Sequence, residues 1–235
     1  VTVADTVEIR GVTVSGATLS GINATGDLTA GPKLAIRDVA VRNSAAAGVL
    51  ALRPSTLAVS GVTVDGSGQD GIRLTDANAS TAQITDVTIT SSSGFGLLLQ
   101  RSRADLARVT IGATSVRAGD TRYSYSGSAL ALADSSVARV SGLTARADNA
   151  DTAYAVVVDR SSRLTALTGS SINTKYQVNV LNGSGADSLL DNVFSTSRWV
   201  SPASSIVSVH RDQNALLVRG NTFTTPNISL FVSQG

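Results

Sequence analysis

The chain has 235 residues, of which 42% are hydrophobic and only 15% charged, with 19 basic and 17 acidic side chains. The formal net charge of +2, with no basic run longer than two residues, excludes the composition of a nucleic-acid-binding protein. Cysteine is absent, which excludes disulfides, thiol catalysis and cysteine-based metal sites. The longest apolar run, 45–52, is too short to insert into a membrane.

A pattern of two short apolar strands separated by a Gly, Ser or Asp turn recurs along the chain. It begins in 7–16, recurs in 34–52 and is clearest in 57–76, LAVSGVTVDGSGQDGIRLTD. Later copies lie in 82–99, 137–158, 164–180 and 215–232. One such unit cannot bury its apolar face alone, so the copies have to stack into a common core.

Most copies are about 22 to 25 residues apart, as marker residues in the two strands indicate. The first-strand markers are Ile36, Val59, Ile84, Leu106, Val140, Leu167, Leu190 and Val218. The second-strand markers are Leu52, Leu74, Leu99, Leu132, Val158, Val180, Val209 and Val232. This spacing predicts a single all-β domain over residues 1–235, a parallel β-helix (β-solenoid) of about nine coils. A right-handed sense follows from the usual hand of parallel crossovers.

Small residues recur at a corner inside the first strand of each copy, where Thr85 and Asp86 interrupt strict alternation. Glycine stands there in several copies: Gly61, Gly142, Gly169 and Gly220. Since glycine permits a backbone bend without a steric penalty, we expect a bulge or corner at this position.

Three copies carry longer connections between their two strands, in 112–128, 147–153 and 196–205. All four tyrosines and the single tryptophan lie in or beside them: Tyr123, Tyr125, Tyr154, Tyr176 and Trp199. Arg122 and Arg198 lie in the same connections. In a stacked solenoid these segments emerge along one edge, and insertions on one face of a repeat protein often mark its working face. One interpretation is loop packing; the other is a lateral groove that stacks sugar rings and holds carboxylates.

A column of polar residues follows the second strands: Pro54, Asp76, Arg101, Asp134, Arg160, Asn182, Arg211 and Gln234. Its alternating charges predict a ladder of exposed ion pairs that sets the register between coils. The catalytic candidates are Lys175, Tyr176 and His210, which could act as a base or a cation in a β-elimination. Asp148 and Asp151 are the only close acidic pair in these loops and the one candidate for calcium; otherwise we expect no metal or cofactor.

The phrases SGVTVDGSGQDGIRL (60–74), DVTITSSSGFGLLLQ (86–100) and VRGNTF (218–223) resemble parallel β-helix repeats of the pectate-lyase-like superfamily. NosD-like and mannuronan epimerase-like proteins carry similar repeats, as do pertactin-like autotransporter passengers more loosely. The resemblance implies a right-handed solenoid in an extracellular or periplasmic setting, often acting with polysaccharide. It extends to no catalytic motif, because Val209 precedes His210 where the epimerase-like pattern has Asp-Pro, and clustered calcium-binding aspartates are missing.

Two functions stay open. One is an extracellular or periplasmic polysaccharide-binding or polysaccharide-processing module with a Tyr/Trp-lined groove; if it is an enzyme, it is a lyase or epimerase acting on a uronate-containing glycan. The other is a non-catalytic structural or adhesive segment of a cell-surface protein, an autotransporter passenger or a phage fibre. Because the chain starts in a strand without Met and ends on the apolar strand 228–232, we expect it to be a segment of a longer chain. We also expect its terminal coils to be covered by further chain or another subunit.

Overall fold

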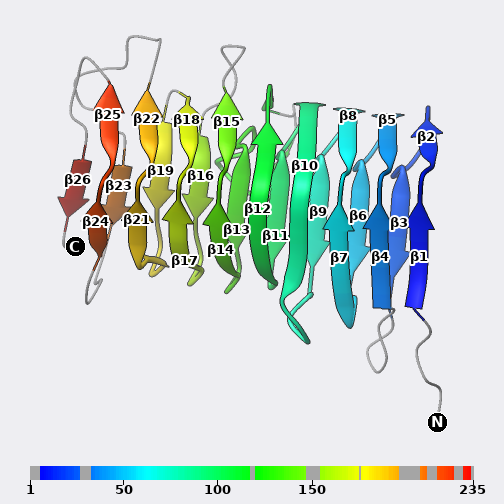
Figure 1. Ribbon diagram of the computed structural model, residues 1–235, viewed down its shortest axis with the longest axis horizontal. Helices are drawn as coiled ribbons and strands as arrows, with labels where there is room; N and C mark the ends of the chain where they lie inside the picture. Colours follow the sequence, from blue (N-terminus) through cyan, green and yellow to red (C-terminus); the bar gives the residue numbers. More distant parts are fainter. Residues whose placement is uncertain are drawn as a thin grey trace.

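The computed structural model describes residues 6–26, 33–116, 120–146, 154–174, 176–195, 207–210, 216–224 and 230–233. Within these ranges the chain forms strands and no helix, and the strands pair in parallel from coil to coil. Figure 1 shows the coils stacked side by side along the long axis of the molecule, from β1 at the N-terminal end to β26 at the C-terminal end. The predicted parallel β-solenoid is confirmed.

The strands form three rows along the stack. Row one contains β1 (Thr6–Arg10), β4 (Lys33–Arg37), β7 (Thr56–Ser60), β14 (Val137–Ser141), β17 (Arg163–Thr168), β20 (Gly185–Ala186), β21 (Ser188–Leu190) and β24 (Leu217–Arg219). Row two contains β2 (Thr13–Ser15), β5 (Ala40–Ser44), β8 (Thr63–Ser67), β15 (Thr144–Arg146), β18 (Ser171–Asn173), β22 (Val193–Ser195) and β25 (Thr222–Thr224). Two longer strands, β10 (Ala82–Ser92) and β12 (Arg103–Ile111), run through both rows and join them into one 17-stranded sheet.

Row three is a separate nine-stranded sheet. It contains β3 (Ile22–Thr25), β6 (Val49–Leu52), β9 (Ile72–Thr75), β11 (Leu97–Gln100), β13 (Leu130–Ala133), β16 (Tyr154–Val158), β19 (Tyr176–Val180), β23 (Val207–His210) and β26 (Leu230–Ser233). The described residues make about 7 turns, slightly fewer than the nine coils expected.

The core fills the space between the rows. In row three, one inward stack consists of Leu74, Leu99, Leu132, Val158 and Val180, all of them 0% exposed. The predicted register needs two one-residue corrections: Ala51 rather than Leu52 pairs with Leu74, and Leu189 rather than Leu190 pairs with Leu167. In both places the sequence offers two adjacent apolar residues, and only pairing with the next coil decides which one faces inward.

The predicted corner lies between rows one and two and has a left-handed backbone. Glycine occupies it with positive φ at the four expected positions and at Gly11. In the remaining coils the corner residue is Asp38, Asp86, Arg108 or Asp191, each with φ between 53° and 55°. Aspartate tolerates this region better than most side chains. At Gly61 a Cβ atom would lie 2.7 Å from the Asp38 carboxylate, so a larger residue there would have to displace that side chain.

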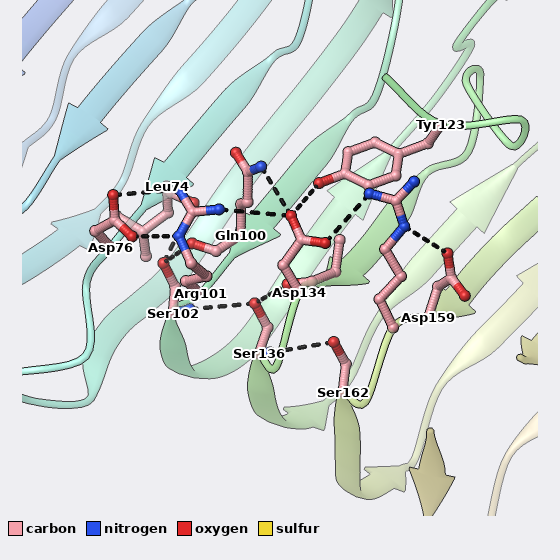
Figure 2. A network of polar contacts seen from close by, with 12 residues as sticks. Leu74, Asp76, Gln100, Arg101, Ser102, Tyr123, Asp134, Ser136, Asp159 and Ser162 are labelled. Atoms are coloured by element: carbon pink, nitrogen blue, oxygen red, sulfur yellow. Dashed lines mark hydrogen bonds and ion pairs between the residues drawn. The ribbon is translucent and has the colours of Figure 1, made fainter. Parts of the chain in front are cut away.

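At another corner, just after row three, buried serine hydroxyls accept hydrogen bonds from backbone N–H groups. There the N–H of one coil donates to the serine Oγ of the next, at 3.1 Å in each step. The accepting serines are Ser102, Ser136, Ser162 and Ser184. A buried N–H without an acceptor is costly, so this serine row fixes the vertical alignment of the coils at the corner. Figure 2 shows three of these serines beside the charged residues discussed below.

Candidate functional site

The long connection of the fifth coil packs down onto the outer face of row three. We call residues 120–128 the strap. Tyr123 and Tyr125 of the strap are each only 4% exposed, and they join a second hydrophobic cluster that is separate from the core. The other buried members of this cluster lie on the solenoid: Phe95, Leu98, Ala131, Ala133 and Val157. Leu98, Ala131 and Val157 belong to one register column, on the side of the sheet opposite the core.

The expectation that Tyr123 and Tyr125 are exposed for ring stacking is wrong. The two rings stack on each other with centroids 5.2 Å apart, and both meet Phe95 edge-on, at 6.0 and 5.9 Å. Because these rings contact each other and the sheet, they do not offer a surface to a sugar. Phe95 lies in this outer cluster and not in the core between the rows.

Arg122 fastens the strap to the solenoid. Its guanidinium donates to both carboxylate oxygens of Asp70, at 2.8 and 3.0 Å, and to Asp120 within the strap. The Asp70 side chain is 0% exposed and also accepts the backbone N–H of Phe95. Burial opposes the charge on Arg122, but its hydrogen bonds to Asp70 and Asp120 outweigh this effect and raise its pKa. The arginine predicted to hold a ligand carboxylate is therefore already paired with two carboxylates of the protein.

A charged network connects the strap to the corner after row three (Figure 2). Asp134 accepts hydrogen bonds from the Tyr123 hydroxyl at 2.7 Å, from Gln100 at 2.9 Å and from Arg160 at 3.3 Å. The Arg160 guanidinium also lies 4.7 Å from the centroid of the Tyr123 ring, a cation–π contact. On the other side, Arg101 contacts both Asp76 and Asp134.

These contacts confirm an ion-pair ladder along the predicted column from Asp76 to Arg160. One member needs correction. Arg53, not Pro54, occupies the position equivalent to Asp76. The Arg53 N–H donates to the carbonyl of Thr75 in the next coil, just as the Asp76 N–H donates to the carbonyl of Gln100, and both residues have positive φ. Alternation of charge therefore begins one coil earlier.

The network sets the protonation of its members. Burial alone would raise the pKa of the Asp134 carboxyl, but hydrogen bonds from Gln100, Tyr123 and Arg160 outweigh it and hold this pKa below its ordinary value. Burial, together with the carboxylate of Asp134, raises the pKa of Tyr123. At neutral pH this site therefore holds an anionic carboxylate and a neutral phenol, a combination that lacks a general acid among its carboxyls.

Tyr154 and Tyr176 form a second aromatic pair on adjacent coils. They are register partners in β16 and β19, and their rings stack with centroids 5.0 Å apart. Both are half-buried, and burial raises the pKa of Tyr154. Of the aromatic residues proposed to bind a glycan, these two retain exposed surface among the described residues.

The structure does not describe the side chains of the remaining catalytic, glycan-binding and calcium-binding candidates. Lys175, Arg198 and Trp199 lie outside the described residues, as do Asp148 and Asp151 of the calcium possibility. His210 ends β23, and its side chain is not described. The described residues contain no group of three or more His, Asp or Glu that could hold a metal ion. They also contain no helix long and apolar enough to cross a bilayer.

The sequence analysis did not predict that the strap packs on the outer face of row three, although the strands beneath it gave an indication. The strands beneath it are apolar without interruption, as in 97–99 (LLL), 129–133 (ALALA) and 155–158 (AVVV). Continuous apolar runs indicate strands buried on both faces, whereas 22–25 (INAT), 72–75 (IRLT) and 177–180 (QVNV) alternate; 49–52 (VLAL) and 230–232 (LFV) are continuous as well.

The described surface has shallow depressions, two of which lie near the features above. One, of about 500 Å³, lies beside the ion-pair ladder and is lined by three arginines, Arg101, Arg103 and Arg160, together with short polar residues. The other, of about 480 Å³, is lined by Gly, Ala, Ser, Thr and Asn near the corner after row two, including Gly16, Gly66 and Gly68.

Comparisons with protein-family models, curated proteins and solved structures found no significant match. The functional argument therefore depends on the geometry described above.

Proposed function

We propose that this chain is a non-catalytic, right-handed parallel β-helix that serves as a rigid structural or adhesive segment of a cell-surface, extracellular or periplasmic protein. The observation that carries the proposal is the strap. At the edge where a groove was expected, Tyr123 and Tyr125 are 4% exposed. An insertion that covers the sheet in this way stabilises the solenoid and removes the space for a polymer.

The state of the charged groups supports the same proposal. Catalysis needs groups that are free to exchange protons or contact a substrate. Here the buried Asp70 is bound by Arg122, and Asp134 accepts three side-chain hydrogen bonds. Such groups hold coils together rather than carry out chemistry. The location at a cell surface follows from the resemblance of the repeats and agrees with the absence of cysteine.

An assay with uronate-containing glycans tests this function. Incubation with alginate, pectate and other polyuronates should yield no unsaturated uronate and no change in epimer composition. The folded state should at the same time resist proteolysis, as expected of a rigid segment. Turnover of any of these polymers, with loss of turnover in a Tyr176→Phe variant, would establish an enzyme instead.

A second candidate is polysaccharide binding at the Tyr154–Tyr176 pair, which the half-exposed stacked rings favour. Aromatic faces bind the apolar side of sugar rings. In this alternative the protein is a glycan-binding module or a uronate lyase or epimerase, with Lys175, Tyr176 or His210 as the base and without a metal. Glycan-array binding that is lost in Tyr154→Ala, but kept in Arg139→Gln on the exposed face of β14, would favour it.

A further inference from the structure

The lining of the depression beside the ion-pair ladder has more guanidinium groups than carboxylates, and the further acidic partners of Arg101 and Arg160, which are Asp76 and Asp159, lie outside the lining. Its lining contains the guanidinium groups of Arg101, Arg103 and Arg160 and one carboxylate, that of Asp134. Arg101 follows β11 and Arg103 begins β12, so these two lie at one level of the stack; Arg160 follows β16 two levels further on, with Asp134 on the level between. The depression is open to solvent, with the Arg101 and Arg160 side chains 46% and 52% exposed.

Two of the arginines are held in position. Arg101 donates to both oxygens of Asp76, and Arg160 donates to Asp134 at 3.3 Å. These contacts use some of the five N–H donors of each guanidinium, and the remaining donors are available to a ligand. Arg103 is exposed, and the structure shows no ion pair for it among the described residues. The depression therefore combines two arginines held by carboxylates with a third, Arg103, that has no ion pair among the described residues.

Short hydroxyl side chains complete the lining. Ser135 and Ser161 are both exposed, and both have a left-handed backbone, with φ of 66° and 61°. Each follows a charged ladder residue, Asp134 or Arg160, that is itself left-handed. Their backbone N–H groups are bonded to the next coil. Their hydroxyls add neutral donors beside the guanidinium groups.

We propose that this depression, which we call the arginine corner, binds a tetrahedral oxyanion, either sulfate or phosphate. Guanidinium groups form charge-assisted hydrogen bonds with such groups, and donors at two levels of the stack suit a ligand whose oxygens point in several directions. The carboxylate of Asp134 contacts Arg101 and Arg160, so the anion would be bound by their remaining N–H donors and by Arg103. The site is exposed, so binding is weak and salt-sensitive. This inference is independent of the proposed function, because a structural segment and a glycan-binding module can both carry the site.

Titration followed by amide NMR at constant ionic strength tests the arginine corner. Sodium sulfate should shift the amide signals of residues 101–103, 134–135 and 160–161, whereas sodium chloride should not. Arg103→Gln removes the uncompensated charge without touching the ladder and should weaken sulfate binding about fivefold. Arg139→Gln is the matched control: it removes an exposed arginine of β14, which is absent from the lining, and should leave binding unchanged.

Two further arms identify the source of the anion. Sulfate and phosphate are compared as free ions, and a sulfated glucose disaccharide is compared with its unsulfated form. A sulfate ester that binds more tightly than free sulfate indicates a sulfated glycan; equal or weaker binding indicates the free ion, and both results support an oxyanion site. Shifts that chloride reproduces, or sulfate binding that Arg103→Gln leaves intact while its melting temperature is unchanged, would overturn the proposal.

Discussion

At the scale of single residues, the most consequential contact is that between Asp70 and Arg122. Asp70 is wholly buried and Arg122 is about one-quarter exposed, with 26% of its side chain accessible. Burying a charge without its partner is far more costly than burying the pair or an apolar replacement of it. Arg122 therefore stabilises the fold by holding the strap, and its guanidinium is not available to bind a ligand.

Replacement of Arg122 by Ala should destabilise the fold by about 3 kcal/mol, because the Asp70 carboxylate is left buried and unpaired. The double variant Asp70→Leu with Arg122→Met should recover part of this loss, since neither charge remains. Denaturant unfolding measures both effects, with Arg139→Ala as the exposed control. Equal stabilities of the Arg122→Ala and wild-type proteins would contradict the buried pair.

Acid should loosen the strap. The hydrogen bond from Arg122 holds the pKa of Asp120 below its ordinary value, and the pKa of Asp134 is also lowered. A carboxyl with a lowered pKa contributes stability that is present above its unfolded pKa of about 4 and is lost as the pH falls through its folded pKa. The near-UV circular dichroism of the tyrosines should therefore be constant from about pH 7 to 5 and diminish below about pH 4. A signal that is unchanged in strong acid would show that these carboxylates do not hold the strap.

At the scale of elements, the strap and the coils beneath it depend on each other. The core lies inside the three rows, whereas the strap covers an apolar patch on the outside of row three. On that face β3, β9 and β19 carry polar residues, whereas β6 carries Leu50 and Leu52, which are half-buried. An exposed apolar patch of this kind promotes association.

Shortening the strap tests this dependence. Replacement of residues 113–127 by the short turn of the preceding coil, SSSG, should leave the solenoid folded but expose Phe95, Leu98 and Val157. We expect increased binding of an apolar dye and self-association. The double variant of shortened strap with Leu98→Lys should restore a monomer. A shortened protein that stays monomeric without dye binding would show that the patch needs no cover.

At the scale of the whole molecule, each coil depends on its neighbours. Leu132 is 0% exposed in the inward stack of row three and lies near the middle of the chain. Replacement by Asp would place an uncompensated charge there and should unfold at least the middle coils. Loss of cooperative melting, or a large fall in the melting temperature, is the expected result. Leu190→Asp, at a half-buried position one residue from the core, should have a much smaller effect.

The first described coil has an uncovered apolar edge. Val7 and Val12 are 48% and 42% exposed, while their register mates in the next coil, Leu34 and Val39, are 4% and 2% exposed. We propose that another coil of the same kind covers this edge, because the coil-to-coil interface repeats throughout the stack. Light scattering of the isolated chain should show association that Val12→Lys reduces. A monomer at high concentration would argue against this cover.

The sequence by itself determined the coil and its repetition. Alternation along each strand, the spacing of the copies and the corner glycines are local signals, and they predicted the solenoid, the inward stack at Leu74 and the ladder from Asp76. Where two adjacent residues satisfied the same pattern, as at Ala51 and Leu52, the choice came from pairing with the next coil.

Only the tertiary structure decided what the strap does. Its position depends on contacts between residues far apart in the sequence: Arg122 reaches Asp70, 52 residues earlier, and Tyr123 packs against Phe95. An alternating pattern shows which face of a strand is apolar, but not which segment covers it. The same tyrosines suit an open groove or a closed surface. The strap is held against row three by the buried ion pair and by the hydrophobic cluster beneath it. Both form only after the coils have stacked.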